Sequence, residues 1–184
     1  GPIPGDLATH ELEKLMAEAE GPVAGLWIEL PSVAPSHQAV LASWLSELQG
    51  VCKRYGALLI LNEVKTGFGR SGRLWDWQNF DLEPDLVVFG GGLKVSGVFK
   101  HAEQTALPAF EPLVLEHERV LSSELLLDVI EDEGLLGHAA VMGDYLSKVL
   151  SELELGFEQI LSVRGRGLRA AFELGSRDER DRVL

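Results

Sequence analysis

Apolar side chains near the start of the chain follow a helical spacing. Leu12, Leu15 and Met16 recur at intervals of three and one, and thus share one face of a helix. We expect this amphipathic helix to be capped by Thr9 and to end at Gly21. The pattern predicts a helix that packs one side against a core.

Three apolar runs have the length of buried strands. They cover residues 24–30, 57–61 and 86–89. Between the first two, apolar residues from Val40 to Val51 predict a second helix, which Gly56 ends. Strand, helix, strand, loop and strand in this order favour a parallel sheet flanked by helices. The predicted fold class is therefore α/β, with a site in the loops beyond the carboxyl ends of the strands.

The second half of the chain has a different pattern. Periodicity fades over residues 100–121, which predicts a loose connection. Beyond it, apolar spacing predicts two helices that Gly134 separates, the first of them capped by Ser122 or Ser123. Residues 162–174 read as a turn leading into a strand. We expect three parts: the α/β part over residues 1–99, the loose connection over residues 100–121, and helices followed by a strand over residues 122–184.

Composition narrows the classes of partner. The chain has 184 residues, 46% of them hydrophobic, which is enough for a buried core. Its 29 acidic and 16 basic side chains give a net charge of −13, which repels nucleic acid and anionic membranes. Cys52 is the single cysteine, and no apolar run approaches the roughly 20 residues of a membrane span. We expect a cytoplasmic protein with no nucleic-acid or membrane partner.

One motif gives a family resemblance. Residues 59–72 read Leu-Ile-Leu-Asn-Glu-Val-Lys-Thr-Gly-Phe-Gly-Arg-Ser-Gly and closely resemble the signature D-E-V-Q-T-G-F-G-R-T-G of class III pyridoxal-phosphate aminotransferases. Residues 89–97 are most similar to the pattern F-G-K-K-x-Q-V-C-G of the lysine 6-aminotransferase branch. Residues 127–135 and 163–168 resemble later segments of the family. The resemblance implies a partial large domain of the fold type I pyridoxal-phosphate transferases and the start of their small domain.

The same resemblance marks departures at the cofactor positions. In the family an aspartate at the place of Asn62 keeps the pyridinium nitrogen protonated, and an amide has no charge to do so. Val64 corresponds to the residue that stacks on the ring where cofactor is bound, but a valine after a strand end more often simply packs, and we favour packing. Lys65 replaces a glutamine that contacts the ring hydroxyl. Gly91 stands where the Schiff-base lysine belongs, and glycine cannot form the imine. Lys94 could replace that lysine only if the loop shifted.

Other family segments are expected to be absent. The glycine-rich phosphate loop and the arginine that binds the substrate carboxylate have no counterpart, and the S-T-W-G-G-N stretch is shortened to Ser122-Ser123. A gap in the sequence would explain that shortening equally well. It would not restore a lysine at Gly91.

Two hypotheses of function follow. The first is a degenerate, catalytically inactive domain that serves as a binding, scaffolding or dimerisation module. It has no bound cofactor and no metal site, and it works as a homo-oligomer or with a protein partner, as the dimeric family implies. The alternative is an active pyridoxal-phosphate transaminase of the lysine or ω-amino type, with Lys94 recruited or with a complementing chain.

A local basic cluster has two interpretations. Arg164, Arg166 and Arg169 could bind an anion or an acidic partner surface. In so acidic a chain we expect instead a solvated turn whose arginines pair with carboxylates such as Glu173.

Overall fold

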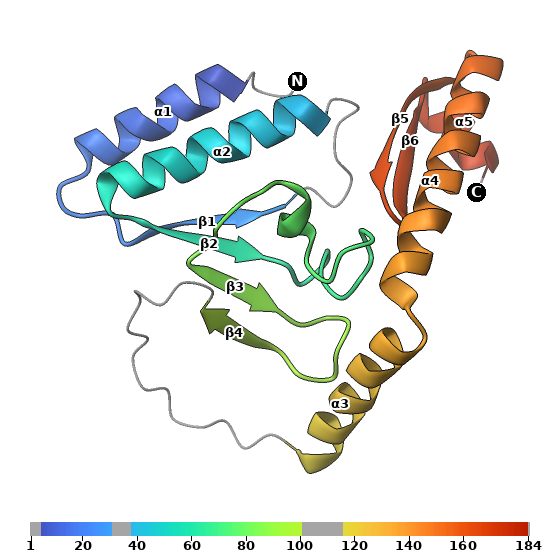
Figure 1. Cartoon of the computed structure of the whole chain (residues 1–184). Helices are drawn as coiled ribbons and strands as arrows, with labels where there is room; N and C mark the ends of the chain where they lie inside the picture. The colour runs from blue at the N-terminus through green and yellow to red at the C-terminus, as the bar shows by residue number, and fades with distance from the viewer. Residues whose placement is uncertain (1–4, 31–37, 101–115, 184) are drawn as a thin grey trace.

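The computed structural model of the chain describes residues 5–30, 38–100 and 116–183. Helices and strands follow one another in the order shown in Figure 1. Their bounds are α1 (Gly5–Glu18), β1 (Gly25–Glu29), α2 (Gln38–Tyr55), β2 (Leu58–Asn62), the short 3-10 helix η1 (Asp76–Asn79), β3 (Leu86–Phe89), β4 (Gly97–Lys100), α3 (His117–Asp132), α4 (Leu135–Gly156), β5 (Ile160–Arg166), β6 (Arg169–Leu174) and α5 (Arg177–Val183).

A four-stranded sheet forms the centre of the first half. Its order is β1-β2-β3-β4, with the first three strands parallel and β4 antiparallel to β3. The three predicted strands and the helix between the first two are therefore confirmed, as is the α/β class. The expectation of a parallel sheet is corrected at β4, which makes the sheet mixed. Four residues that include a glycine were too few to show a strand pattern.

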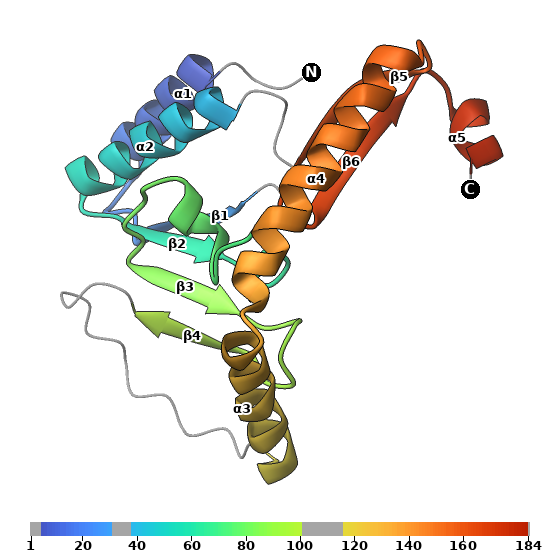
Figure 2. The ribbon, with the colours of Figure 1, turned by 45° about the vertical axis from the view of Figure 1, so that its right-hand side comes forward.

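The core lies on one face of this sheet. Helices α1 and α2 run side by side there (Figures 1 and 2). Leu59 and Leu61 of β2 are almost completely buried beneath them, together with Leu45 and Val51 of α2. Phe80 and its neighbours after η1 close the same core. Burying such side chains stabilises a fold by about 1.5 to 3 kcal/mol each, so this face holds the domain together.

An aromatic cluster closes the same face over β3 and β4. The ring of Trp75 lies 4.8 Å from that of Phe68 and 5.1 Å from that of Phe99, centroid to centroid. Phe89 of β3 lies 6.2 Å from the ring of Trp75. These tilted contacts are typical of stabilising aromatic packing, so the segment between β2 and β3 is anchored on the sheet.

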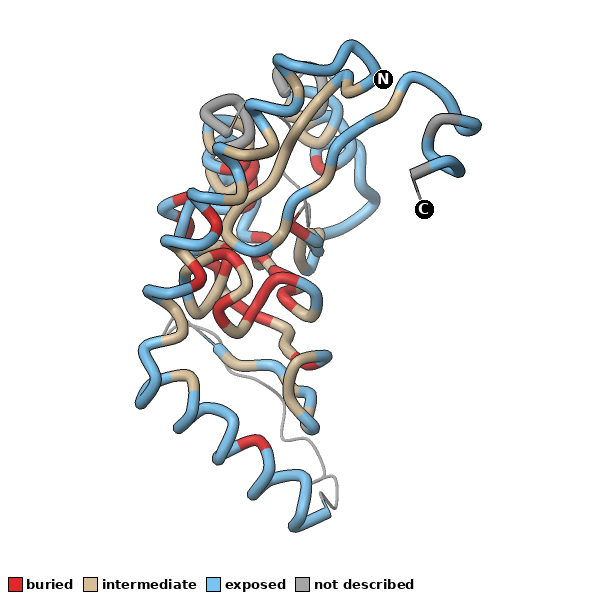
Figure 3. The backbone as a smooth tube through the Cα atoms, turned by 90° about the vertical axis from the view of Figure 1, so that its right-hand side faces the viewer, coloured by how far each residue is buried: buried red, intermediate tan, exposed pale blue. Residues whose placement is uncertain are grey.

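The second half of the chain is more open. Helix α4 packs against the two-stranded hairpin β5–β6, and α3 extends away from the sheet with most of its length exposed (Figure 3). The closest approach of α4 to the hairpin turn uses two glycines. A Cβ placed on Gly143 would lie 2.4 Å from the Cα of Gly167, so any side chain there would force the elements apart.

Two predicted helix caps are wrong. Thr9 lies inside α1, where its hydroxyl donates to Oε2 of Glu47 at 2.9 Å. Ser122 and Ser123 lie inside α3, which already begins at His117, and their hydroxyls donate to carbonyl oxygens four residues earlier at 2.6 and 2.8 Å. Serine and threonine hydroxyls form hydrogen bonds inside helices as well as at helix caps. Residue type alone therefore did not locate the starts of these two helices.

The predicted connection and the last strand also differ in part. Residues 101–115 of the expected loose connection lie outside the described residues, Lys100 ends β4, and residues 117–121 open α3. Residues 162–174 belong to a hairpin with a turn at Gly167, so Ser162 to Arg166 form a strand rather than a turn. The division into three parts stays a prediction. Over the described ranges, no helix is both long and apolar enough to cross a membrane.

Candidate functional site

The carboxyl ends of the parallel strands meet at one edge of the sheet. Glu29 at the end of β1 pairs in register with Asn62 at the end of β2, and Asn62 pairs with Val88 of β3. Gly91 follows β3 and lies against the backbone of Val64. The structure therefore brings Asn62, Val64 and Gly91 to the same edge, where an open α/β sheet carries its site.

Asn62 uses its side-chain oxygen inside the loop. Its Oδ1 accepts a hydrogen bond from the backbone N–H of Val64 at 3.1 Å, an arrangement that asparagine readily makes at a turn. Of the two ends of the Asn62 amide, only the oxygen can accept from this N–H, because the NH2 group is a donor. The edge of the sheet thus carries a neutral amide at this position and no carboxylate.

Gly91 occupies a position that excludes side chains. Its φ of +66° lies in the left-handed region that favours glycine. A Cβ added there would be 2.7 Å from the carbonyl oxygen of Val64, which is backbone and cannot swing aside. A lysine at this position would meet both backbone strain and a steric clash. Lys94 lies exposed three residues farther along the same loop.

Lys65 is held across the edge by a charge pair. Its Nζ lies 2.6 Å from Oε1 of Glu29, and its carbonyl oxygen accepts a hydrogen bond from the guanidinium of Arg169. The ammonium therefore turns toward the end of β1. Glu29 bonds a neighbouring loop in this way.

A buried carboxylate lies directly beneath the edge, and sequence reasoning missed it. Glu63 is completely buried; its Oε2 accepts from the Thr66 hydroxyl at 2.5 Å and its Oε1 from the Trp77 N–H at 2.8 Å. Burial raises the pKa of the Glu63 carboxyl, and the negative charge of Asp76 adds to that rise. Hydrogen bonds from the Thr66 hydroxyl and from the backbone N–H groups of Trp77 and Asp76 oppose it. This carboxylate ties the strand end to η1.

A buried ion pair joins η1 to the hairpin. Nη1 of Arg166 lies 2.7 Å from Oδ1 of Asp76, with only 14% and 6% of their side chains exposed. The guanidinium also lies 4.1 Å from the centre of the Phe80 ring, a cation–π contact. The expected solvated turn is thus wrong for Arg166, although Arg164 pairs with Glu173 at 3.4 Å as predicted. A contact across ninety residues leaves no local sequence signal.

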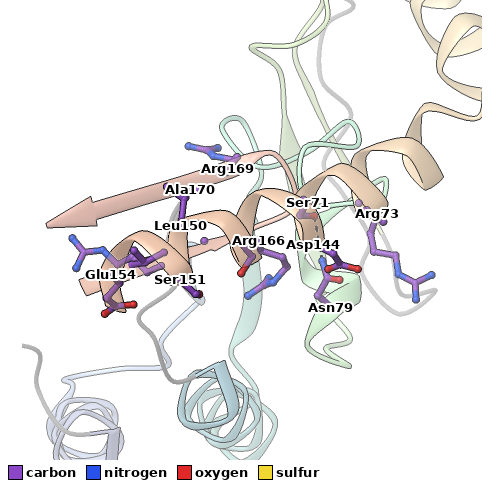
Figure 4. Close-up of a pocket in the computed structure, with 18 residues that line it drawn as sticks. Ser71, Arg73, Asn79, Asp144, Leu150, Ser151, Glu154, Arg166, Arg169 and Ala170 are labelled. Carbon is purple, nitrogen blue, oxygen red and sulfur yellow. Dashed lines mark hydrogen bonds between the residues drawn. The ribbon is translucent and has the colours of Figure 1, made fainter. Parts of the chain in front are cut away.

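A groove of about 580 Å³ is lined by residues of α4, of the hairpin and of the segment from Ser71 to Asn79. Arg166, Asp144 and Asn79 lie at one end of it, and Ser151 and Glu154 at the other (Figure 4). The lining mixes guanidinium and carboxylate groups. Neither Asn62 nor Gly91 lines the groove, so it is separate from the carboxyl edge of the sheet.

Metal binding has no support in the described ranges. No three histidine, cysteine, aspartate or glutamate side chains gather there in a way that could hold a metal ion. The expectation of no metal site concerns the whole chain and stays a prediction.

Comparison with known proteins gives a consistent result. The sequence profile of the family Aminotransferase class-III matches residues 5–184. The chain is 34% identical over 151 residues to the L-lysine-epsilon aminotransferase of Mycobacterium tuberculosis, covering 77% of this chain and 34% of that protein. It is 30% identical over 181 residues to the acetylornithine aminotransferase of Aquifex aeolicus, covering 95% of this chain and 46% of that protein. The chain thus spans about a third to a half of the length of these curated relatives.

A solved structure shows the same fold. The acetylornithine aminotransferase of Elizabethkingia anophelis superimposes with a TM-score of 0.76 over 91% of this chain, at 23% identity. The match covers 44% of that chain, so more than half of its structure lies outside the shared part.

Proposed function

Because this chain belongs to the class-III aminotransferase family, we propose that it is a degenerate member which keeps part of the fold, lacks transaminase activity and acts as a binding or scaffolding module. The single observation that carries the proposal is the backbone at Gly91. The position that corresponds to the family's Schiff-base lysine has a left-handed φ and no room for a Cβ beside Val64.

The polar groups at the edge support the same proposal. Pyridoxal phosphate, where the family binds it, supplies an electron sink whose strength depends on a protonated ring nitrogen. Asn62 is a neutral amide whose oxygen bonds the Val64 N–H, so it offers no negative charge to hold that proton in place. Lys65, in the place of a ring-contacting glutamine, is paired with Glu29 instead. These residues do not fit the cofactor, and we assign no catalytic step to them.

One observation favours the alternative of an active transaminase of the lysine or ω-amino type. Lys94 lies exposed in the loop after β3, only three residues from Gly91, and two relatives are named as aminotransferases. Such an enzyme would need Lys94 to be recruited or a second chain to complete the site. The required change of loop register makes this the second candidate, because catalysis tolerates displacements of only about 1 Å.

The test is a titration of the purified chain with pyridoxal phosphate, followed by borohydride reduction and mass spectrometry of the peptides. We expect no saturable absorption change and no stoichiometric adduct. Lys94→Ala is the matched control for the recruited lysine, and the M. tuberculosis relative serves as the positive control. A stoichiometric adduct on Lys94 that Lys94→Ala removes would establish the alternative.

The proposed module acts through protein association. Its partner is a second copy or another protein, and the acidic surface disfavours nucleic acid and anionic membranes. The single cysteine agrees with the cytoplasmic location that we propose for it.

A further inference from the structure

The groove along α4 carries side chains of both charges. Four arginines and two carboxylates line it. Two of the guanidinium groups are already balanced by carboxylates outside the lining, because Arg166 pairs with Asp76 and Arg164 pairs with Glu173. The ligand that the groove attracts therefore depends on the charged side chains that remain.

The remaining charges of the groove are not neutralised. Arg73 and Asp144 are exposed and Glu154 is half-buried, and none of the three forms an ion pair with a described residue. Arg169 donates to the carbonyl oxygen of Lys65, which is a neutral acceptor. Opposite charges thus lie in one groove without pairing. A ligand that carries both signs of charge can neutralise them, whereas a simple anion or cation would meet repulsion from part of the lining.

The groove is elongated along α4. Asp144, Ser147, Ser151 and Glu154 line it at spacings of three and four residues, so they share one face of the helix. Figure 4 shows Arg73 and Asp144 toward one end of the groove and Glu154 at the other. The helix spans roughly 15 Å between Asp144 and Glu154. An extended chain rises by about 3.3 Å per residue, so about four to five residues of a peptide match this length.

Backbone contacts hold the groove in this shape. Gly143 of α4 lies against Gly167 at the hairpin turn, and a Cβ on Gly167 would lie 2.5 Å from the carbonyl oxygen of Arg70. Backbone atoms of α4, the hairpin and the loop before η1 therefore meet with no side chain between them. Such contacts keep the three segments at fixed distances. The groove is thus preformed, which lowers the entropic cost of binding.

Hydroxyl groups lie between the two ends of the groove. Ser147 and Ser151 are exposed on the face of α4 that lines it. A hydroxyl both donates and accepts, so it can bond the backbone N–H or C=O of an extended segment. Leu150 and Val163 are the only large apolar side chains in the lining that the structure describes. Charge and backbone hydrogen bonds therefore determine what binds here.

We propose that the groove binds an extended segment of a partner protein that carries a basic and an acidic side chain four residues apart. The basic side chain pairs with Glu154, and the acidic side chain pairs with Arg73. Asp144, beside Arg73, accepts from a backbone N–H of the segment. This inference rests on the proposed function, since it names the site and the partner chemistry of the binding module.

The probes are the pentapeptide Lys-Ala-Ala-Ala-Glu and its reverse, with blocked termini, because an extended segment can run in either direction. They are titrated into the full chain labelled with nitrogen-15, and the backbone amide shifts are followed by NMR. We expect saturable shifts at groove residues such as Ser147 and Gly165 with one of the two peptides. The neutral peptide Gln-Ala-Ala-Ala-Gln is expected to bind about tenfold more weakly.

Two charge-removing variants test the assigned pairs. Glu154→Gln and Arg73→Gln are each expected to weaken binding of the charged peptide about threefold, and the double variant about tenfold. Neither is expected to change the affinity for the neutral peptide, because its side chains carry no charge to lose. Ser147→Phe places a large side chain midway along the groove and is expected to abolish the saturable shifts. Circular dichroism confirms that the variants fold.

The matched control is Glu152→Gln, because Glu152 lies on α4 beside Lys148 and does not line the groove. It is expected to leave the affinity unchanged. Absence of saturable shifts with both charged peptides, or equal weakening by Glu152→Gln, would overturn the proposal. So would inorganic phosphate that produces the same shifts at the same concentration, because the groove would then bind a simple anion.

The two proposals fail separately. A pyridoxal-phosphate adduct on Lys94 would end the claim of lost catalysis and leave the peptide titration untouched, because Lys94 does not line the groove. A failed peptide titration would end the claim of a peptide site while the absence of an adduct still stood.

Discussion

The two faces of the central sheet are similar in composition and different in environment. Leu59 and Leu61 on one face are at most 1% exposed, whereas Trp27 on the other is 57% exposed. Leu59 and Leu61 belong to the central strand β2, whereas Trp27 belongs to the edge strand β1. Helix α2 and the segment before β3 cover the Leu61 face, and we call the opposite face, which carries Trp27, the open face.

The sharpest contrast is expected from truncating one side chain on each face. Leu61→Ala removes a completely buried side chain and is expected to lower the free energy of unfolding by about 2 to 5 kcal/mol. Trp27→Ala, on the open face, is expected to cost much less because over half of that side chain is already in water. Urea denaturation of both variants measures the difference, and similar losses would contradict the comparison.

The stability of the protein is also expected to depend on the buried ion pair between Asp76 and Arg166. Asp76→Asn keeps a hydrogen-bond acceptor for Arg166 but removes the charge, and is expected to lower the free energy of unfolding by about 1.5 to 3 kcal/mol. Glu173→Gln is the control, because its pair with Arg164 is exposed and worth at most about 1 kcal/mol. Equal effects in thermal denaturation would show that the Asp76 pair is no more important than a surface pair.

A side chain introduced at Gly91, at the carboxyl edge of the sheet, is expected to destabilise the protein. Gly91→Ala is expected to lower the free energy of unfolding by about 1 to 3 kcal/mol, because φ is positive and the added Cβ meets the Val64 carbonyl. Gly137→Ala in α4 is the matched control. No atom lies within 4 Å of the place that its new methyl group would take, and alanine favours a helix by about 1 kcal/mol. A stable Gly91→Ala variant would remove the main support for the lost lysine.

A smaller, pH-dependent effect is expected at Glu63. Burial raises the folded-state pKa of this carboxyl, so the unfolded chain ionises first as pH rises above about 4.3. As pH rises from that value to the raised folded-state pKa, the free energy of unfolding of the wild type therefore decreases. Glu63→Gln, which does not ionise, should gain stability over the wild type through this interval and keep the gain at pH 7. A constant difference between the variants at all pH values would contradict the raised pKa.

The sequence predicted those helices and strands whose own residues carry a clear hydrophobic pattern. Apolar runs located β1, β2 and β3, and their order placed Asn62 and Gly91 at a common edge. It predicted helix starts less well, because serine and threonine occur both as helix caps and inside helices. The hydroxyl of Ser123 resembles a helix cap but bonds inside α3.

Contacts between distant segments could not be predicted. The buried pair of Asp76 and Arg166 depends on how the hairpin packs against η1. The buried Glu63 depends on how η1 folds back onto the end of β2. The open face was equally hidden, because alternation along Leu58 to Asn62 defines two faces and does not say which one is covered.

Hydroxyl-radical footprinting with mass spectrometry tests the comparison of the two faces most directly. In the isolated chain, Trp27 and Val98 should be oxidised readily while Leu59 and Leu61 stay protected. Protection of Trp27 in the dilute, isolated chain would contradict the open face.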